Sequence, residues 1–308
     1  QTPYKFTHNV WLSDDSKTIF TTDERSDASV AAYDISDLTD IRLLDEFRMP
    51  STIGKGVIPH NVHVLNDFLV IAHYTEGVTI VDASRPENLV QVGNYDTNHD
   101  FENGFHGVWD AFPYYPSGLI SAGDIENGLF VLQPTYVRAA WLEGRVTDVE
   151  TGDPVVNASV EILSADPNFA ASDATGNYKT GQPTPGNFEV KFRAKGFFDL
   201  TISMVPLETG EVTLLDAEMT PIPIHNIQGF IVEDHDVRVE GAIIRLENQD
   251  FIYVDTTDAE GKYLFPSVKE GDYKVFIGRW GYLNQLWENL NFDHDEVRYF
   301  AVTRGYED

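Results

Sequence analysis

The chain has 308 residues, more than one ordinary hydrophobic core accommodates, so two or three domains are expected. Its 21 basic and 50 acidic residues give a formal net charge of −29, which disfavours binding to nucleic acid or to an anionic membrane surface. It contains no cysteine, which excludes disulfides, thiolate metal sites and thiol nucleophiles.

Short runs of strand-forming residues recur along the whole chain, such as VEILSA, FEVKFRA and YKVFIG. Turn residues (Gly, Asp, Asn and Pro) separate these runs at intervals of about 8–12 residues, the spacing of all-β domains. No segment keeps the helical apolar period over a helical length. The sequence therefore predicts an all-β protein.

The first third of the chain contains an internal repeat. Segment 8–47 aligns with 60–95, and a diverged third copy lies at 106–133. Each complete copy predicts four short strands, and the copies begin about 50 residues apart at His8, His60 and His106. This pattern predicts a partial β-propeller of about three four-stranded blades over residues 1–137.

Three blades alone leave two blade faces uncovered. Propellers close with at least about four blades, each of which buries its faces against both neighbours. Uncovered apolar sheet faces in water are unfavourable. We therefore expect this chain to be a segment of a longer protein, or to complete its ring with the remaining blades or with another protein chain.

A second type of repeat occupies the rest of the chain. Segment 142–199 aligns with 227–284 without gaps, and five Gly or Tyr pairs, among them Gly144 with Gly229 and Tyr178 with Tyr263, share one offset of 85 residues. Hairpin-turn residues recur in both copies as DATGNY and DAEGKY. Two homologous β-sandwich domains are predicted, at 140–222 and 223–308.

Both copies resemble the carboxypeptidase regulatory-like domain. The resemblance rests on the motifs GRVTD, NASVEI, GNY, FEV and the GF that follows them, and the second copy departs from it at DHDVRVEG. It implies a small seven-stranded, prealbumin-like or Ig-like sandwich. It also implies a non-catalytic spacer or docking module of secreted and outer-membrane proteins.

The first third resembles the LVIVD-repeat propellers of bacterial secreted proteins, notably the choice-of-anchor B family. The segments GVTIVDASRPENLVQVGNYDT, IPHNVHVLND and YYPSGLISAGDIENGLFVLQPTY carry the resemblance to the last blades of that family. It implies export and a location outside the cell or at the bacterial cell surface.

The histidines that open the repeats form a candidate site. In a blade, the start of the first strand and the end of the second lie at the same rim of the ring. Imidazole and carboxylate groups at such a rim suit a divalent transition metal, the candidate cofactor. The predicted ligands, or the groups that orient them, are His8, His60, His106, Asp23, His73 and Asp124, and Glu24 and Glu76 are nearby.

A structural alternative explains the same residues. The HN and HG pairs would satisfy the backbone where strands begin, and a wet channel rim gathers polar residues. His63, inside the apolar run, is expected to be packed and hydrogen-bonded. The two DHD triplets, at 234–236 and 293–295, are expected to be solvated turns.

The sequence favours a non-enzymatic, extracellular or cell-surface binding or scaffold protein, with surface proteins or glycans as partners. The first alternative is a metal-dependent propeller enzyme that uses the His/Asp rim. The second is a carbohydrate-binding accessory subunit of a surface uptake complex. No apolar run reaches the roughly 20 residues needed to span a bilayer and no signal peptide is recognisable, while the start at Gln1 indicates a processed or excised terminus.

Overall fold

The computed structural model describes residues 1–100, 103–233 and 237–305, and it confirms the all-β prediction. One short 3₁₀ helix, η1 (Pro50–Thr52), interrupts the strands of the described part. No helix within these ranges is long and apolar enough to cross a membrane. The chain divides into two units, Gln1–Ala194 with Asp199–Met219, and Lys195–Phe198 with Thr220–Asp308.

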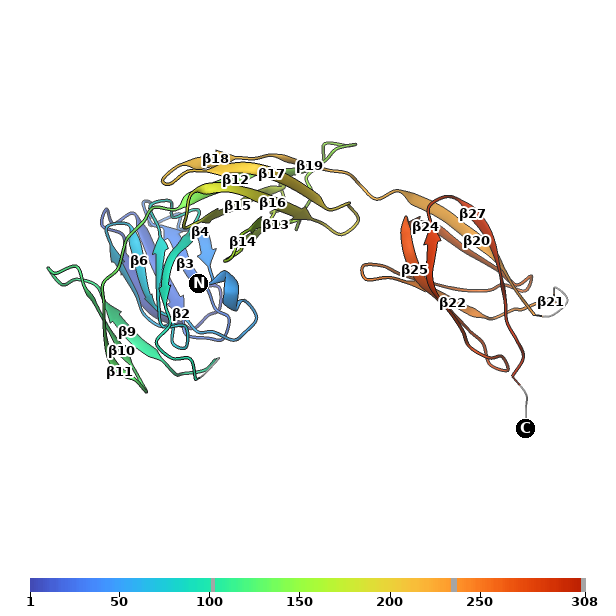
Figure 1. Cartoon of the computed structure of the whole chain (residues 1–308), viewed down its shortest axis with the longest axis horizontal. Helices are drawn as coiled ribbons and strands as arrows, with labels where there is room; N and C mark the ends of the chain where they lie inside the picture. The colour runs from blue at the N-terminus through green and yellow to red at the C-terminus, as the bar shows by residue number, and fades with distance from the viewer. Residues whose placement is uncertain (101–102, 234–236, 306–308) are drawn as a thin grey trace. The chain divides into compact units, whose positions relative to one another are not determined.

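The first sheet is a four-stranded antiparallel meander in which each strand pairs with the next one along the chain (Figure 1). Successive side chains of each strand point to opposite faces of the sheet, so each face receives every second residue. They are β1 (Thr7–Leu12), β2 (Thr18–Asp23), β3 (Val30–Asp34) and β4 (Arg42–Phe47).

The second and third sheets repeat this meander. The second has four strands, β5 (Val62–Leu65), β6 (Phe68–Ala72), β7 (Val78–Asp82) and β8 (Val90–Tyr95). The third has three, β9 (Val108–Phe112), β10 (Ile120–Asp124) and β11 (Gly128–Leu132), one fewer than the four-stranded unit expected from the repeat. No strand pairing joins the first sheet to the third among the described residues, so these strands do not close a ring.

The second sheet packs between the other two. One of its faces contributes Val62, Val64, Leu69 and Ile71 to a core shared with Phe20 and Val30 of the first sheet. The opposite face contributes Val70, Ala72 and Ile80 to a core shared with Val108 and Ala122 of the third sheet. Because both faces are covered, every residue of β6 and β7 is buried.

Two β-sheets form the first sandwich. The first sheet has the order β15-β12-β18, with β19 also paired to β12, and the second has the order β14-β13-β16-β17. The strands are β12 (Ala140–Asp148), β13 (Ser159–Leu163), β14 (Asn168–Ala171), β15 (Asn177–Gln182), β16 (Gly186–Arg193), β17 (Leu200–Leu207), β18 (Val212–Leu214) and β19 (Ala217–Met219).

The second sandwich, in the second unit, repeats the topology of the first. Its sheets have the orders β21-β20-β24, with β27 paired to β20, and β23-β22-β25-β26. In each sandwich the long first strand pairs in parallel with the last strand or strands. The strands are β20 (Ile224–Glu233), β21 (Val237–Arg238), β22 (Ile243–Glu247), β23 (Ile252–Thr256), β24 (Lys262–Lys269), β25 (Gly271–Gly278), β26 (Gln285–Phe292) and β27 (Glu296–Ala301).

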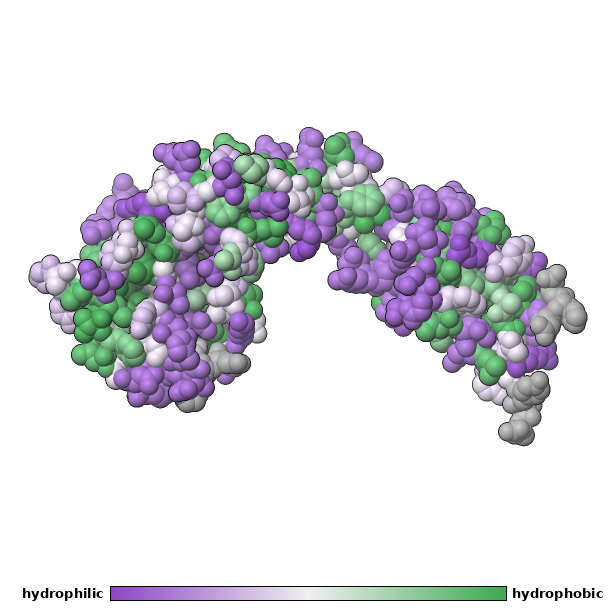
Figure 2. Space-filling model, viewed as in Figure 1, coloured by the Kyte–Doolittle hydropathy of each residue, from purple (hydrophilic) through white to green (hydrophobic). Residues whose placement is uncertain are grey.

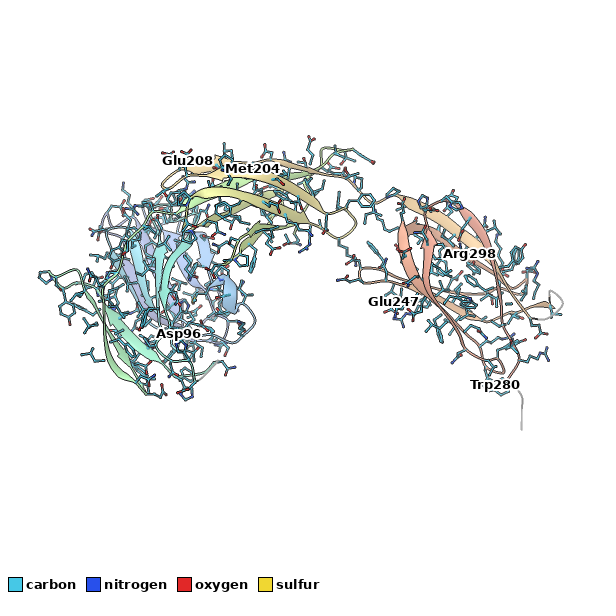
Figure 3. The ribbon with its side chains drawn as sticks, in the orientation of Figure 1. Asp96, Met204, Glu208, Glu247, Trp280 and Arg298 are labelled. Atoms are coloured by element: carbon cyan, nitrogen blue, oxygen red, sulfur yellow. The ribbon has the colours of Figure 1, made fainter. Side chains whose placement is uncertain are left out.

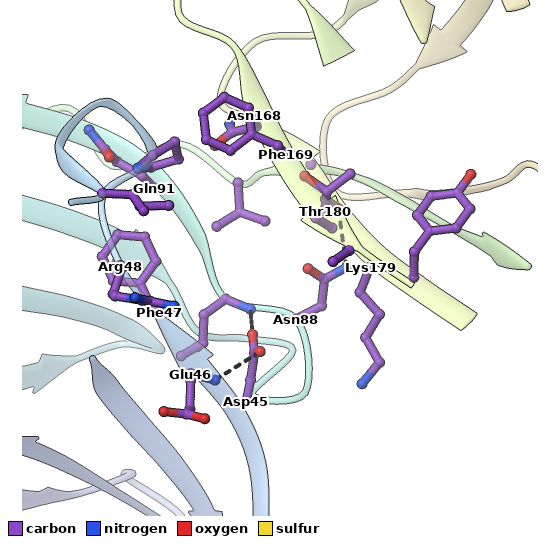
Figure 4. A pocket seen from close by; sticks show the side chains of 18 of the residues that line it. Asp45, Glu46, Phe47, Arg48, Asn88, Gln91, Asn168, Phe169, Lys179 and Thr180 are labelled. Atoms are coloured by element: carbon purple, nitrogen blue, oxygen red, sulfur yellow. Dashed lines mark hydrogen bonds between the residues drawn. The ribbon is translucent and has the colours of Figure 1, made fainter. Parts of the chain in front are cut away.

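The second sheet and the first sandwich share a small core of Val90, Ala139 and Trp141. Beside it lies a groove of about 610 Å³, which Figure 4 shows between the strand that carries Asp45 and Phe47 and the strand that carries Lys179 and Thr180. Polar side chains also pair across the joint, since the Asn88 amide donates to Glu143 Oε1 at 3.0 Å and to the Thr180 carbonyl at 3.2 Å. The joint is therefore built from both apolar packing and paired polar groups.

Candidate functional site

Three side chains from the first and second sheets converge where these sheets begin. His8 lies near the start of β1, Glu24 directly follows β2, and His60 precedes β5. His8 Nδ1 is 3.3 Å from Glu24 Oε2, and His60 Nε2 is 3.6 Å from Glu24 Oε1. Their potential ligand atoms lie within 4.8 Å of one another, and no other group of three or more His, Asp or Glu side chains in the described ranges meets this criterion.

The His60 ring is held in one orientation. Its Nδ1 hydrogen-bonds the carbonyl oxygen of Trp109, which belongs to the third sheet, at 2.5 Å. Its Nε2 is buried and has no hydrogen-bond partner. Burial lowers the pKa of His60, which favours the neutral ring. A neutral ring whose Nδ1–H donates to Trp109 carries a lone pair on Nε2, directed toward the Glu24 carboxylate.

The Glu24 carboxylate is positioned by Tyr74 of the second sheet. The Tyr74 hydroxyl donates to Glu24 Oε1 at 2.7 Å. Burial raises the pKa of Tyr74, so its hydroxyl stays protonated and keeps donating. The His8 ring stacks on His60 with centroids 4.2 Å apart, and its side chain is one-third exposed, which leaves an opening toward solvent.

The structure does not bring the other predicted ligands to this cluster. Asp23 faces the N-terminal segment, where it accepts hydrogen bonds from the Thr2 hydroxyl at 2.7 Å and from the backbone N–H groups of Tyr4 and Phe6. Asp124 accepts from the Thr97 hydroxyl at 2.6 Å and from the backbone of the turn that follows β10. Both carboxylates therefore have structural partners in this fold.

His106 forms a separate pair in the third sheet. Its Nδ1 is 2.7 Å from Glu126 Oε1, and Glu126 also accepts from the Gly107 backbone N–H. His63 is packed and hydrogen-bonded, as predicted, since its Nε2 is 3.0 Å from Asp110 Oδ1 and its ring packs on Trp11. The DHD triplet at 234–236 lies outside the described residues, whereas in the other triplet Asp295 caps the backbone N–H of Asn226.

His73 is fully buried beside Phe47, and its Nδ1 lies 3.0 Å from the Thr79 hydroxyl. Burial lowers the pKa of His73 to about 4. This side chain therefore belongs to the interior of the second sheet.

We expect His73 to weaken the fold at acidic pH. The unfolded chain, with an ordinary histidine pKa, takes up a proton below about pH 6.5, whereas the folded chain does not, so the free energy of unfolding falls by about 2 kcal/mol between pH 6.5 and pH 5. Urea unfolding at several pH values in chelator measures this slope. It should be flatter in His73→Gln and unchanged in His99→Gln, which alters an exposed loop histidine. An equal slope in His73→Gln and the parent chain would contradict the assignment.

The first and third sheets each expose one apolar face. In the first sheet, Leu12, Ile19, Tyr33 and Leu43 lie side by side across all four strands on the face opposite Phe20, and Leu12 and Leu43 are about half exposed. In the third sheet the outward face carries Phe112, Leu129 and Val131, with Val131 61% exposed. Figure 2 shows hydrophobic residues gathered over β9–β11.

Three tryptophans are exposed to different degrees, and two of them, Trp11 and Trp109, still make aromatic contacts between sheets. Trp11 packs on His63 and Tyr114, and Trp109 packs on His60, so both join neighbouring sheets. Trp280, in the second unit, is 89% exposed and lies in a loop between strands (Figure 3).

Comparison with known proteins identifies one part of the chain. Residues 142–220 match the carboxypeptidase regulatory-like domain. This confirms the resemblance predicted for the first sandwich. None of the curated proteins matches the chain. The resemblance of residues 1–137 to LVIVD-repeat propellers is not shown by these matches and stays a prediction.

Solved structures give distant likenesses. The Streptococcal ancillary pilin is 14% identical, with 63% of this chain and 77% of the pilin covered at a TM-score of 0.41. The minor pilin GBS52 of Streptococcus agalactiae is 10% identical, with 55% of this chain and 98% of that pilin covered at a TM-score of 0.38. The shaft pilin SpaA of Lactobacillus rhamnosus GG is 8% identical, with 56% of this chain and 99% of that pilin covered at a TM-score of 0.26. Scores this low do not establish a shared overall fold.

Proposed function

We propose that this chain is a non-enzymatic binding and scaffold protein of the bacterial cell surface. The first three sheets are blades of a larger propeller-like body, and the two sandwiches act as spacer modules. The pair of uncovered apolar faces on the first and third sheets carries this proposal. The match of residues 142–220 to a regulatory-like domain supports the spacer role.

The occupant of these faces is a β-sheet of the same kind as the second sheet. Within the chain, the face of one meander packs on the next with aliphatic side chains from both, once between the first and second sheets and once between the second and third. The open faces continue this series at both ends. An additional antiparallel sheet with an apolar face would bury Leu12 and Leu43 at one end, and Leu129 and Val131 at the other.

Photo-crosslinking in the cells that make the protein tests this proposal. A benzophenone amino acid is placed at Leu43 or at Val131, and a matched control is placed at Leu214, which is 77% exposed on the first sandwich. We expect both face positions to capture strand segments of further propeller blades, and Leu214 to capture none. Reaction yields at Leu43 and Val131 no higher than at Leu214 would contradict the proposal.

The isolated chain should tolerate charge on these faces. We expect Leu43→Asp and Val131→Asp each to change the free energy of unfolding by no more than about 0.5 kcal/mol, because both side chains already contact water. The same replacement at Val64, which is buried against the first sheet, should unfold the region. Urea unfolding of the three variants measures the contrast, and equal losses at Leu43 and Val64 would show that the first face is covered within the chain.

A second candidate function is that of a metal-dependent enzyme, favoured by the convergence of His8, Glu24 and His60. Two imidazoles and one carboxylate leave a coordination position for water or substrate in catalytic zinc sites. A panel of ester, phosphoester and peptide substrates, assayed with the Zn²⁺-loaded chain, tests it. Turnover that disappears in Glu24→Gln would support the enzyme, and turnover equal in both proteins would remove it.

A further inference from the structure

We propose that His8, Glu24 and His60 bind one divalent transition-metal ion, with Zn²⁺ the best fit, and that this ion ties the first sheet to the second. The site goes beyond the scaffold role, because it concerns how the sheets are held together. His8 and Glu24 come from the first sheet, His60 from the entry to the second.

The buried Nε2 atom of His60 is the feature that most favours a bound cation. Its Nε2 is buried without a hydrogen-bond partner, and the nearest charged atom is Glu24 Oε1 at 3.6 Å. With Nδ1–H donating to Trp109, this arrangement sets a nitrogen lone pair against a carboxylate oxygen. A buried, unpartnered nitrogen lone pair that faces a carboxylate is unfavourable unless a cation lies between them, and the Glu24 side chain is itself only 17% exposed.

The three ligand atoms lie within 4.8 Å of one another, close enough for small side-chain movements to bring them onto a tetrahedral ion. Metal–ligand bonds of about 2.0–2.1 Å at tetrahedral angles place neighbouring ligand atoms about 3.3 Å apart. His8 Nδ1 lies 3.3 Å from Glu24 Oε2, and His60 Nε2 lies 3.6 Å from Glu24 Oε1, so each imidazole has one carboxylate oxygen near this spacing. Two imidazoles with one carboxylate favour zinc and related transition metals over Ca²⁺ or Mg²⁺, which prefer oxygen ligands.

The surrounding groups orient the ligands as in known metal sites. The Trp109 carbonyl fixes the His60 ring, and the Tyr74 hydroxyl fixes the Glu24 carboxylate. Histidine ligands of metals commonly donate their other ring N–H to a carbonyl, which raises their basicity and selects the tautomer. Trp109 lies in β9 of the third sheet and Tyr74 in the turn between β6 and β7 of the second, so segments of all three sheets take part in the site.

The exposed ligands provide the variants for a test. His8 is at the surface end of the site, so His8→Ala is expected to fold, and Glu24→Gln keeps the shape of the side chain and its hydrogen bond from Tyr74. His106→Ala and His99→Ala are matched controls, since each removes a histidine of the first unit that lies outside the cluster. Circular dichroism confirms folding of each variant.

Titration calorimetry of the chelator-treated full chain with Zn²⁺ alone, and absorption spectra with Co²⁺, test the proposal. We expect one Zn²⁺ per chain, tetrahedral Co²⁺ absorption bands, and loss of both in His8→Ala and Glu24→Gln but not in the two controls. Tyr74→Phe, which removes only the donor to Glu24, should weaken Zn²⁺ binding about 10- to 100-fold. Absence of stoichiometric binding, or binding that survives in His8→Ala and Glu24→Gln, would overturn the proposal. Loss in His106→Ala would overturn it in favour of a site spread around the rim.

Discussion

Replacing Gly144 by alanine is expected to lower the free energy of unfolding of the first sandwich by about 3 kcal/mol or more. Gly144 lies in the middle of β12, where the chain of β18 and β19 runs alongside in parallel. A Cβ atom at this position would lie 2.0 Å from the Leu215 carbonyl oxygen. The backbone at Leu215 cannot move aside as a flexible side chain can, so the segment that contains β18 and β19 must move away from β12.

The Gly144→Ala substitution is also expected to break a hydrogen bond. The Tyr178 hydroxyl donates to the Leu215 carbonyl at 2.6 Å, and a displaced carbonyl would leave this buried hydroxyl without its acceptor. The second sandwich repeats the arrangement, with Gly229 against the carbonyl of Arg298, which accepts from Tyr263 at 2.9 Å. Gly229→Ala should therefore destabilise the second sandwich to a similar extent.

Urea unfolding of Gly144→Ala beside Gly123→Ala measures the effect. Gly123 lies within β10, and a Cβ atom there would meet nothing within 4 Å, so its replacement should be neutral to about 0.5 kcal/mol. If Gly144→Ala unfolds at the same urea concentration as Gly123→Ala, the close approach of the two strands is not a feature of the folded protein.

The second large effect is expected at Asp82, the fully buried carboxylate that joins the second sheet to the first sandwich. Asp82 Oδ1 accepts from Arg138 Nη1 at 2.9 Å, and Oδ2 accepts from the Ala139 backbone N–H at 2.9 Å. Asp82→Ala removes the acceptor of the buried Ala139 N–H and leaves Arg138 with only the more distant Asp67 carboxylate. It also removes the hydrogen bonds that Ser84 donates to Asp82. Removing one partner of a fully buried ion pair costs about 3–5 kcal/mol. Because the Arg138 side chain is 36% exposed, we expect a smaller loss here, of about 2–3 kcal/mol.

Two further variants separate this ion pair from general effects of charge. Asp67→Asn removes the other carboxylate near Arg138, which is 3.5 Å away and mostly exposed, and asparagine tolerates the positive φ of this position, so the change should cost less than about 1 kcal/mol. Asp82→Asn keeps an acceptor oxygen and should lie between the two. Urea unfolding and limited proteolysis of the segment 133–140 report the outcome. Equal stability of Asp82→Ala and Asp67→Asn would show that the joint does not depend on this pair.

The sandwiches could be predicted in detail because their repeat fixes both chemistry and position. The offset of 85 pairs Gly144 with Gly229 and Tyr178 with Tyr263, and these are the residues that meet a carbonyl of the parallel strand in each sandwich. Only glycine permits that approach, so the constraint is visible in the sequence. The hairpin turns could also be predicted from the sequence, since Gly176 and Gly261 adopt positive φ after the DAT and DAE segments.

The candidate site could be predicted only in part. The alignment of repeats placed His8 and His60 correctly at the start of neighbouring sheets, and these two side chains meet. It selected Asp23 as the carboxylate, whereas Glu24 is the one that faces the histidines. Successive side chains of a strand point to opposite faces, so an error of one residue reverses the direction, and the register shift between Thr7 and Asn9 adds to it.

The third sheet has three strands instead of four, and the cause is a contact that the chain makes after β11 with a residue of the second sheet. After β11 the chain continues to Arg138 and Ala139, whose pairing with Asp82 carries it onto the first sandwich. In the first two copies of the repeat the chain continues from the third strand into a fourth, so their four-stranded pattern could not predict that the third copy lacks its fourth strand. The ion pair itself joins residues 56 positions apart, which no local motif indicates.

Hydroxyl-radical footprinting, read by mass spectrometry on the isolated chain and on the protein assembled in its cells, tests the docking of the open faces most directly. We expect Leu12, Leu43, Leu129 and Val131 to be oxidised in the isolated chain and protected in the cell, and Leu214 to be oxidised equally in both. Oxidation of the four face residues to the same extent in both states would contradict it.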